Sequence, residues 1–259
     1  MMETVVTSDE YALLQAVTAN PDDDLARLVY ADWIEEHGRA ERAEFIRLQI
    51  ERDRQAATDP HARGISWREY ELLRENEVDW RSEMPPLLRE GISYRRGFVY
   101  RLRCSIRALI ETTREYRLID PIECLKVTVD SVDPEWMAYH PPPLSLPLAE
   151  LNIDCPLSVG PLLITALIRY GPFPRLHKLS IHDQNLGDEG VTNMRLMPTS
   201  FPLLRELDLS NCNIGDRGAE ELGEYEWTDQ LKLLRLTNNQ FNPGRVAWLR
   251  RRFGQALVL

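Results

Sequence analysis

The sequence lacks the features of membrane, disulfide-stabilised and zinc-binding proteins. None of its apolar runs approaches the roughly 18 residues that a membrane helix needs. No basic start followed by an apolar run opens the chain, so we expect no signal peptide and no membrane association. Its four cysteines have none of the close spacings of zinc sites or small disulfide scaffolds. We therefore expect free, mostly buried thiols in a cytoplasmic protein: Cys104, Cys124, Cys155 and Cys212.

The motifs of common enzyme classes are also missing. The sequence has no glycine-rich phosphate loop, no His-Glu-x-x-His and no Gly-x-Ser-x-Gly. Its five histidines are scattered. His177 and His182 fall in one repeat and, with Asp183 or Asp154, could bind a metal, but the period around them predicts a polar surface only. We expect no cofactor, no metal and no enzymatic activity.

Lysine is scarce, and charge is distributed unevenly. The formal net charge is −10. Residues 1–92 hold 21 Asp and Glu against 11 Arg, whereas residues 93–259 hold 20 acidic and 20 basic residues. This step predicts two modules with a boundary near Gly91, and the acidic first module argues against nucleic-acid binding.

A repeated pattern of leucines dominates the second module. In residues 204–218, Leu204, Leu207 and Leu209 alternate as in a short strand with one buried face, and Cys212 and Ile214 follow. Asp216, between two glycines, is a candidate N-cap for a helix over residues 217–222. Similar patterns start at Leu176 and Leu231, offset by 28 and 27 residues, and weaker ones start at Ile122 and Leu148.

This pattern resembles the leucine-rich repeat. Its period and its Gly-Asp-x-Gly turn, which occurs at residues 187–190 and 215–218, are similar to the longer, ribonuclease-inhibitor-like class. The resemblance implies an α/β solenoid of about five to six repeats over residues 93–259, with parallel strands on its concave side and helices on its convex side. A proline-rich loop around Pro141–Pro143 is either a variable convex connection or a polyproline recognition segment.

The first module is expected to be helical. Capping residues, Pro21 and Gly38 predict helices over about 8–20, 23–37 and 40–56. In the second helix, Leu25, Leu28, Val29 and Trp33 form an apolar stripe at helical spacing. Aromatic and aliphatic residues between Trp67 and Trp80 predict further core helix.

Asp32 falls on that predicted stripe, where a carboxylate requires a partner. Arg27, Arg47 and Gln49 are the candidates, so we predict a structural clamp of Arg27, Asp32, Arg47 and Gln49 between the second and third helices. The alternative is that Asp32 is a catalytic acid in an enzymatic or effector module, although no His, Ser or Cys is placed to work with it.

Several short sequence segments of this module resemble a second family. Asn20–Asp24, Arg27–Trp33, Glu36–Gly38 and Glu44–Gln49 are similar to the repeat-companion domain, a helical module found beside leucine-rich and other repeats in planctomycetes and myxobacteria. The resemblance covers about residues 8–52 and implies a bacterial source and a helical cap over residues 1–92. In relatives with this arrangement of domains, an Arg-Gly-Phe sequence stands at the start of the repeats, as it does here at residues 96–98.

Parallel strands at this period expose a row of alternate side chains, which in leucine-rich repeats binds proteins. We therefore predict an adaptor, monomeric by itself, that binds a protein of unknown identity; a purely structural scaffold is the alternative. The predicted concave positions are Glu123, Lys126, Glu150, Asn152, His177, Lys178, Ser180, His182, Arg205, Glu206, Asp208, Ser210, Lys232, Arg235 and Thr237.

Overall fold

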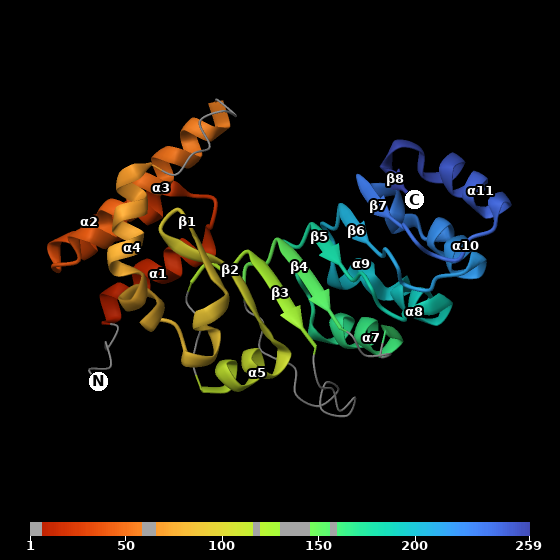
Figure 1. The fold of residues 1–259 in the computed structure, drawn as a ribbon, viewed down its shortest axis with the longest axis horizontal. Helices are drawn as coiled ribbons and strands as arrows, with labels where there is room; N and C mark the ends of the chain where they lie inside the picture. The colour runs from red at the N-terminus through yellow and green to blue at the C-terminus, as the bar shows by residue number, and fades with distance from the viewer. Residues whose placement is uncertain (1–6, 59–65, 116–119, 130–145, 156–159) are drawn as a thin grey trace. The chain divides into compact units, whose positions relative to one another are not determined.

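The chain folds into two compact units (Figure 1). The structure, a computed structural model, describes residues 7–58, 66–115, 120–129, 146–155 and 160–259. The N-terminal unit comprises Met1–Leu102 and Tyr116–Ile122, and the C-terminal unit comprises Arg103–Glu115 and Glu123–Leu259. The proline-rich loop lies outside the described residues.

The N-terminal unit is mainly helical, as predicted. Its elements are α1 (Ser8–Ala19), α2 (Asp24–Glu36), α3 (Ala40–Thr58), α4 (Trp67–Ser82), a 3₁₀ helix (Pro86–Gly91), β1 (Ile92–Arg95) and β2 (Phe98–Ser105), which runs on into the other unit. The Asp23 carboxylate accepts the N–H of Leu25 at 2.8 Å and caps α2. Gly38, at φ +81°, follows the end of α2, which is the expected left-handed position.

The predicted apolar stripe of α2 is wrong for two of its four residues, since Leu28 and Trp33 are partly buried and pack against the core. Leu25 is 66% exposed and Val29 is 46% exposed, whereas the buried positions are Arg27, Tyr30, Ala31 and Ile34. Both sets have helical spacing, so periodicity alone does not separate them. The core selects the second set because Tyr30, Ala31 and Ile34 pack with α1, α3 and Phe98.

Only some of the aromatic and aliphatic residues of α4 that were predicted to be in the core are buried. Leu72 and Trp80 are buried and pack with Phe45 of α3. Trp67, Tyr70 and Val78 are exposed. Only one face of this single long helix contacts the rest of the unit, so the other apolar side chains face solvent.

β2, the strand expected to open the repeats, begins in the N-terminal unit and is the neighbour of β3 in the strand order. β2 pairs antiparallel with β1 through a two-residue turn, Arg96-Gly97, in which both residues have positive φ. Phe98, directly after the turn, is buried in the core formed by α1, α2 and α3.

The C-terminal unit alternates helices with short parallel strands. Its strands are β3 (Cys124–Thr128), β4 (Glu150–Asp154), β5 (Lys178–Ser180), β6 (Glu206–Asp208), β7 (Leu233–Arg235) and β8 (Leu257–Val258). The helices are α5 (Ile106–Glu115), α7 (Gly160–Tyr170), α8 (Gly187–Asn193), α9 (Met197–Ser200), α10 (Asp216–Glu224) and α11 (Pro243–Phe253), with 3₁₀ helices at Met194–Leu196, Glu226–Gln230 and Gly254–Ala256.

The strands lie side by side in chain order (Figure 1), and β3 to β8 are parallel. One leucine from each of β3 to β7 occupies the same register position, and each is at most 3% exposed: Leu125, Leu151, Leu179, Leu207 and Leu234. α7 packs on α8, α8 on α10 and α10 on α11, on one side of the strands. The described sheet is open, and the solenoid stays a prediction.

Aspartates of the glycine turns cap the following repeat rather than their own. Gly215, not Asp216, is the N-cap of α10, and it has no side chain to offer. The Asp188 carboxylate accepts the N–H groups of Gly215 (2.7 Å) and Gly218 (3.0 Å) instead. Asp216 in turn accepts the N–H of Asn242 before α11. The predicted N-cap role of Asp216 is therefore wrong, and these bonds join successive repeats.

We expect Asp188→Ala to lower the free energy of unfolding by about 1–2 kcal/mol, because the first turn of α10 loses its only side-chain acceptor in the described residues. Asp188→Asn, which keeps an oxygen acceptor, is expected to lose less. Urea denaturation followed by circular dichroism measures both. Glu189→Ala, an exposed neighbour in the same helix, is the control. A loss no larger than that of the control would contradict the capping role.

Candidate binding face on the parallel strands

The exposed side of the strands carries two registered columns of polar side chains. Glu150, Lys178, Glu206 and Leu233 occupy one column. Asn152, Ser180, Asp208 and Arg235 occupy the column two residues later. Since the leucines between them are buried, both columns point to the opposite side of the sheet from the core.

Charges of opposite sign alternate along these columns. Lys178 Nζ lies 3.7 Å from a Glu150 carboxylate oxygen, and Arg235 Nε lies 4.0 Å from an oxygen of Asp208. The Lys178 and Arg235 side chains are 44% and 46% exposed. Pairs this exposed contribute about 0–1 kcal/mol to stability. The fold therefore depends little on these charges, and they remain accessible to a ligand.

The two columns border a depression of about 270 Å³, which we call the strand-face hollow. Ser180, only 6% exposed, is its most buried polar residue. The hollow is lined by Asn152, Lys178, Leu179, Ser180, His182, Glu206, Leu207, Asp208, Leu233 and Arg235. Seven of these ten were among the predicted concave residues.

The other predicted residues lie beside the hollow or away from it. Lys126 is in register with Asn152, one strand further along the sheet. The Arg205 guanidinium donates to Gln230 at 2.7 Å, and the Ser210 hydroxyl donates to Asp208 at 2.6 Å. The remaining ones do not line the hollow: Glu123, Glu150, His177, Lys232 and Thr237.

Three lining residues were not among those predicted, Leu179, Leu207 and Leu233, and of these Leu233 alone stands in an outward-facing column. β7 pairs Leu233 with Glu206, so Leu233, and not Lys232, occupies the column of Lys178. Aligning Leu234 with Leu207 would have found it, but an apolar residue was not expected on a polar face.

The predicted clamp residues do not form one cluster. Arg47 donates to Asp32 at 2.6 Å and to Glu35 at 2.7 Å, but the Asp32 side chain is 69% exposed. Asp32 was expected on a buried stripe, and that expectation is wrong because α2 turns the opposite face to the core. The burial that suggested a catalytic acid is therefore missing.

Arg27 and Gln49 belong to a different set of contacts. Arg27 is 1% exposed, lies over the ring of Phe98 at 5.6 Å and donates to the carbonyl of Asp23. The Gln49 side chain accepts the Gly97 N–H at 2.7 Å and donates to Glu69 at 2.9 Å.

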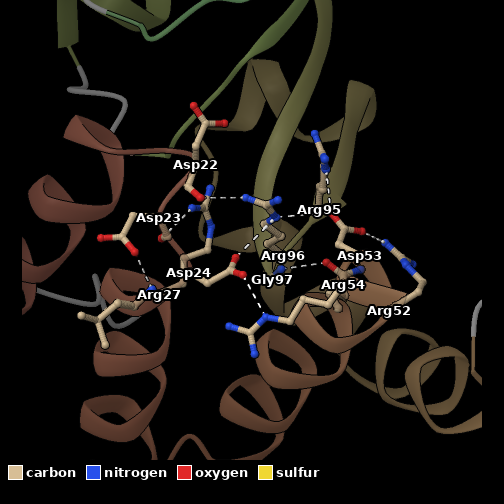
Figure 2. A network of polar contacts seen from close by, with 12 residues as sticks. Asp22, Asp23, Asp24, Arg27, Arg52, Asp53, Arg54, Arg95, Arg96 and Gly97 are labelled. Atoms are coloured by element: carbon tan, nitrogen blue, oxygen red, sulfur yellow. Dashed lines mark hydrogen bonds and ion pairs between the residues drawn. The ribbon is translucent and has the colours of Figure 1, made fainter. Parts of the chain in front are cut away.

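Figure 2 shows the network of arginines and aspartates around the β1–β2 turn, Arg96-Gly97. Arg95 and Arg96 both contact Asp53, at 2.8 and 3.3 Å, and Arg96 also approaches Asp24 at 3.6 Å. Burial opposes the ionisation of Asp53, but the hydrogen bond and charge of Arg95 keep its pKa below the ordinary value. The network joins the start of α2, α3 and the β1–β2 turn, so we interpret it as structural.

Other groups with reactive chemistry are enclosed in the fold. Burial raises the pKa of the Cys212 thiol to about 12, and this thiol contacts the carbonyl of Ile181. Burial also raises the pKa of Asp120 to about 6, and its carboxylate accepts the N–H of Val99 at 3.2 Å. In the part of the chain that the structure describes, no three His, Cys, Asp or Glu side chains gather as metal ligands would.

Comparison with known proteins identifies one segment. Residues 202–223, which include β6 and all of α10 except its last residue, match the family model described as Leucine Rich repeat. No curated protein matches the chain. Within the described residues, no helix has the length and apolarity to cross a membrane. Leucine-rich repeats are generally protein-interaction modules, and the family match supports such repeats in the C-terminal unit.

Proposed function

We propose that the chain is a non-enzymatic adaptor that binds a protein partner through the exposed side of β3 to β7. The observation that carries the proposal is the strand-face hollow, which gathers side chains of both charges around the small, buried Ser180. Mixed charges on a rigid sheet favour specificity, because a partner must match the order of the signs as well as the shape.

The weak pairing of these charges supports the same function. Lys178 and Arg235 sit 3.7 and 4.0 Å from their carboxylate partners, distances at which each can rotate toward a group on a bound protein. Leu233, in the same column as Lys178 and Glu206, adds apolar surface at the end of the face. A face of this kind combines polar and apolar contact, as protein interfaces do.

The proposal includes the finer expectations from the sequence. Residues 93–259 form a leucine-rich-repeat solenoid whose concave side is this face, and residues 1–92 form a repeat-companion module. The adaptor acts as a monomer in a bacterial cytoplasm and does not bind nucleic acid. The wide spacing of the four cysteines and the net charge of −10 in residues 1–92 support this setting.

Reversing the two basic residues of the hollow is expected to abolish partner binding. Affinity capture from native cell lysate with Lys178→Glu/Arg235→Glu should recover at least about tenfold less of the partner that the wild type retains. The reason is that the two new carboxylates repel the acidic groups of the partner that Lys178 and Arg235 attract. The melting temperature should stay near that of the wild type, since both side chains are half-exposed.

The matched control is Arg217→Glu/Arg250→Glu, which changes the net charge equally but lies on α10 and α11. This variant should retain the partner. Equal recovery by wild type and the Lys178/Arg235 variant would contradict the proposed face. Equal loss in both double variants would show an effect of net charge and not of this site.

A further inference from the structure

The exposed side of α2 is apolar. Leu25 and Val29 are one helical turn apart and are among the exposed large apolar side chains of the described residues. Leu28 lies beside them on the helix and is half-buried. Exposed apolar side chains that cluster on one helix face are unusual for a surface that contacts only water.

A second depression adjoins this face, on α2 and α3, and we call it the helix-pair hollow. It measures about 430 Å³. Its lining surface is mostly apolar, and its aliphatic lining residues are Leu28, Leu48 and Ile50, of which Ile50 is only 1% exposed. The α3 residues that line it recur at intervals of three and four, the spacing of one helix face: Glu44, Arg47, Leu48, Glu51 and Arg54. An apolar depression along two packed helices has the form that accommodates a third helix.

Acidic charge is in excess around the helix-pair hollow. Arg47 contacts two carboxylates, Asp32 and Glu35, and Arg54 is paired with Asp24. Glu51 contacts an uncharged amide, that of Gln55, and no arginine contact of its side chain is found in the described residues. Both lining arginines are thus already neutralised by this chain, and the unbalanced charge that remains is negative.

Glu44, which also lines the hollow, is held in its charged form. A hydrogen bond from Arg68 holds the pKa of Glu44 below its ordinary value. The wider surface has the same sign, because residues 1–92 carry a net charge of −10. A ligand of positive charge is therefore favoured both at the hollow and during approach to it.

We infer that the exposed faces of α2 and α3 bind an amphipathic helix of a partner protein, with aliphatic side chains on one face and basic residues flanking them. Its aliphatic side chains contact Leu25, Leu28 and Val29 and enter the helix-pair hollow. Its lysines or arginines lie beside Glu51 and the carboxylates around Arg47. This site is separate from the strand-face hollow and does not depend on the function proposed for it.

A synthetic peptide provides a direct test. The probe is an 18-residue helix of leucine, alanine and lysine, with leucines spaced three and four apart. Titration of the ¹⁵N-labelled full chain should shift the amides of α2 and α3, and fluorescence anisotropy gives the dissociation constant. Leu25→Gln/Val29→Gln should raise that constant by about tenfold or more, because it removes exposed apolar contacts without disturbing the core.

Two comparisons separate this site from non-specific attraction. Val78→Gln on α4, where the side chain is 83% exposed, should leave the affinity unchanged. A peptide with glutamate in place of lysine, and one with the leucines scrambled, should both bind more weakly. The inference is overturned if the scrambled peptide binds equally, if the shifts fall on β3 to β7, or if no shifts occur. It is also overturned if the wild type self-associates through this face, since a second copy would then be its occupant.

Discussion

Gly97→Ala is expected to lower the free energy of unfolding by about 3 kcal/mol or more. Gly97 has φ +81°, a conformation that alanine adopts only with strain. A Cβ at this position would lie 2.1 Å from Ile46 Cγ1 and 2.7 Å from Ile46 Cα. Ile46 is fully buried in α3, so neither its side chain nor its backbone has room to move aside.

Gly38→Ala separates the two causes of this loss. Gly38 has the same φ of +81°, but nothing lies within 4 Å of the position that its Cβ would take. It should therefore lose only the strain, about 1–2 kcal/mol. Urea denaturation followed by tryptophan fluorescence and circular dichroism measures both variants. Equal losses would show that the β1–β2 turn does not depend on close approach to α3.

The repeated strands could be predicted because the constant spacing of their leucines is compatible with only one arrangement of the strands. Leucines at a fixed offset of 27 or 28 residues can be buried together only if each repeat adds one strand in the same register. The structure has this arrangement at Leu179, Leu207 and Leu234. The polar columns follow from it, because side chains alternate across a strand.

The core-facing side of α2 could not be predicted in this way, because the helix carries two stripes of equal spacing. Hydropathy favours the stripe of Leu25, Leu28 and Val29. The buried stripe contains Arg27, whose cost of burial is reduced by contact with the Phe98 ring and the Asp23 carbonyl. These partners are distant in sequence or belong to the backbone, so the residues of α2 alone do not reveal them.

Contacts between successive repeats were likewise invisible in a single repeat. Asp216 has the residue type and position of an N-cap, yet its carboxylate serves the next helix. Which helix an aspartate caps depends on the separation of neighbouring repeats. That separation is set by the close approach of Gly218 to Asp188, since a Cβ on Gly218 would lie 2.6 Å from an Asp188 oxygen. The sequence shows that Asp188 and Asp216 stand at capping positions, but it does not show which helix each carboxylate caps.

Asn239 makes the most demanding of these contacts between repeats. Its side-chain oxygen accepts the N–H groups of Cys212 and Ile214, both at 3.0 Å. Its amide nitrogen donates to the carbonyls of Leu209 (2.8 Å) and Leu236 (2.9 Å). All four of these residues are at most 1% exposed. One side chain thus satisfies four backbone groups, in two repeats, that have little access to water.

We expect Asn239→Ala to lower the free energy of unfolding by roughly 3–5 kcal/mol, because each buried backbone group left without a partner costs about 1–3 kcal/mol and the four effects are not fully additive. Urea denaturation measures this loss. Gln240→Ala, at the next residue, removes one exposed hydrogen bond to Asn213 and should cost less than about 1 kcal/mol. Asn239→Asp keeps the acceptor but turns a carboxylate toward two carbonyls, so it should not restore stability. Losses from Asn239→Ala no larger than those of the control would mean that water or a shift of the chain satisfies these groups, and that the repeats do not depend on this side chain.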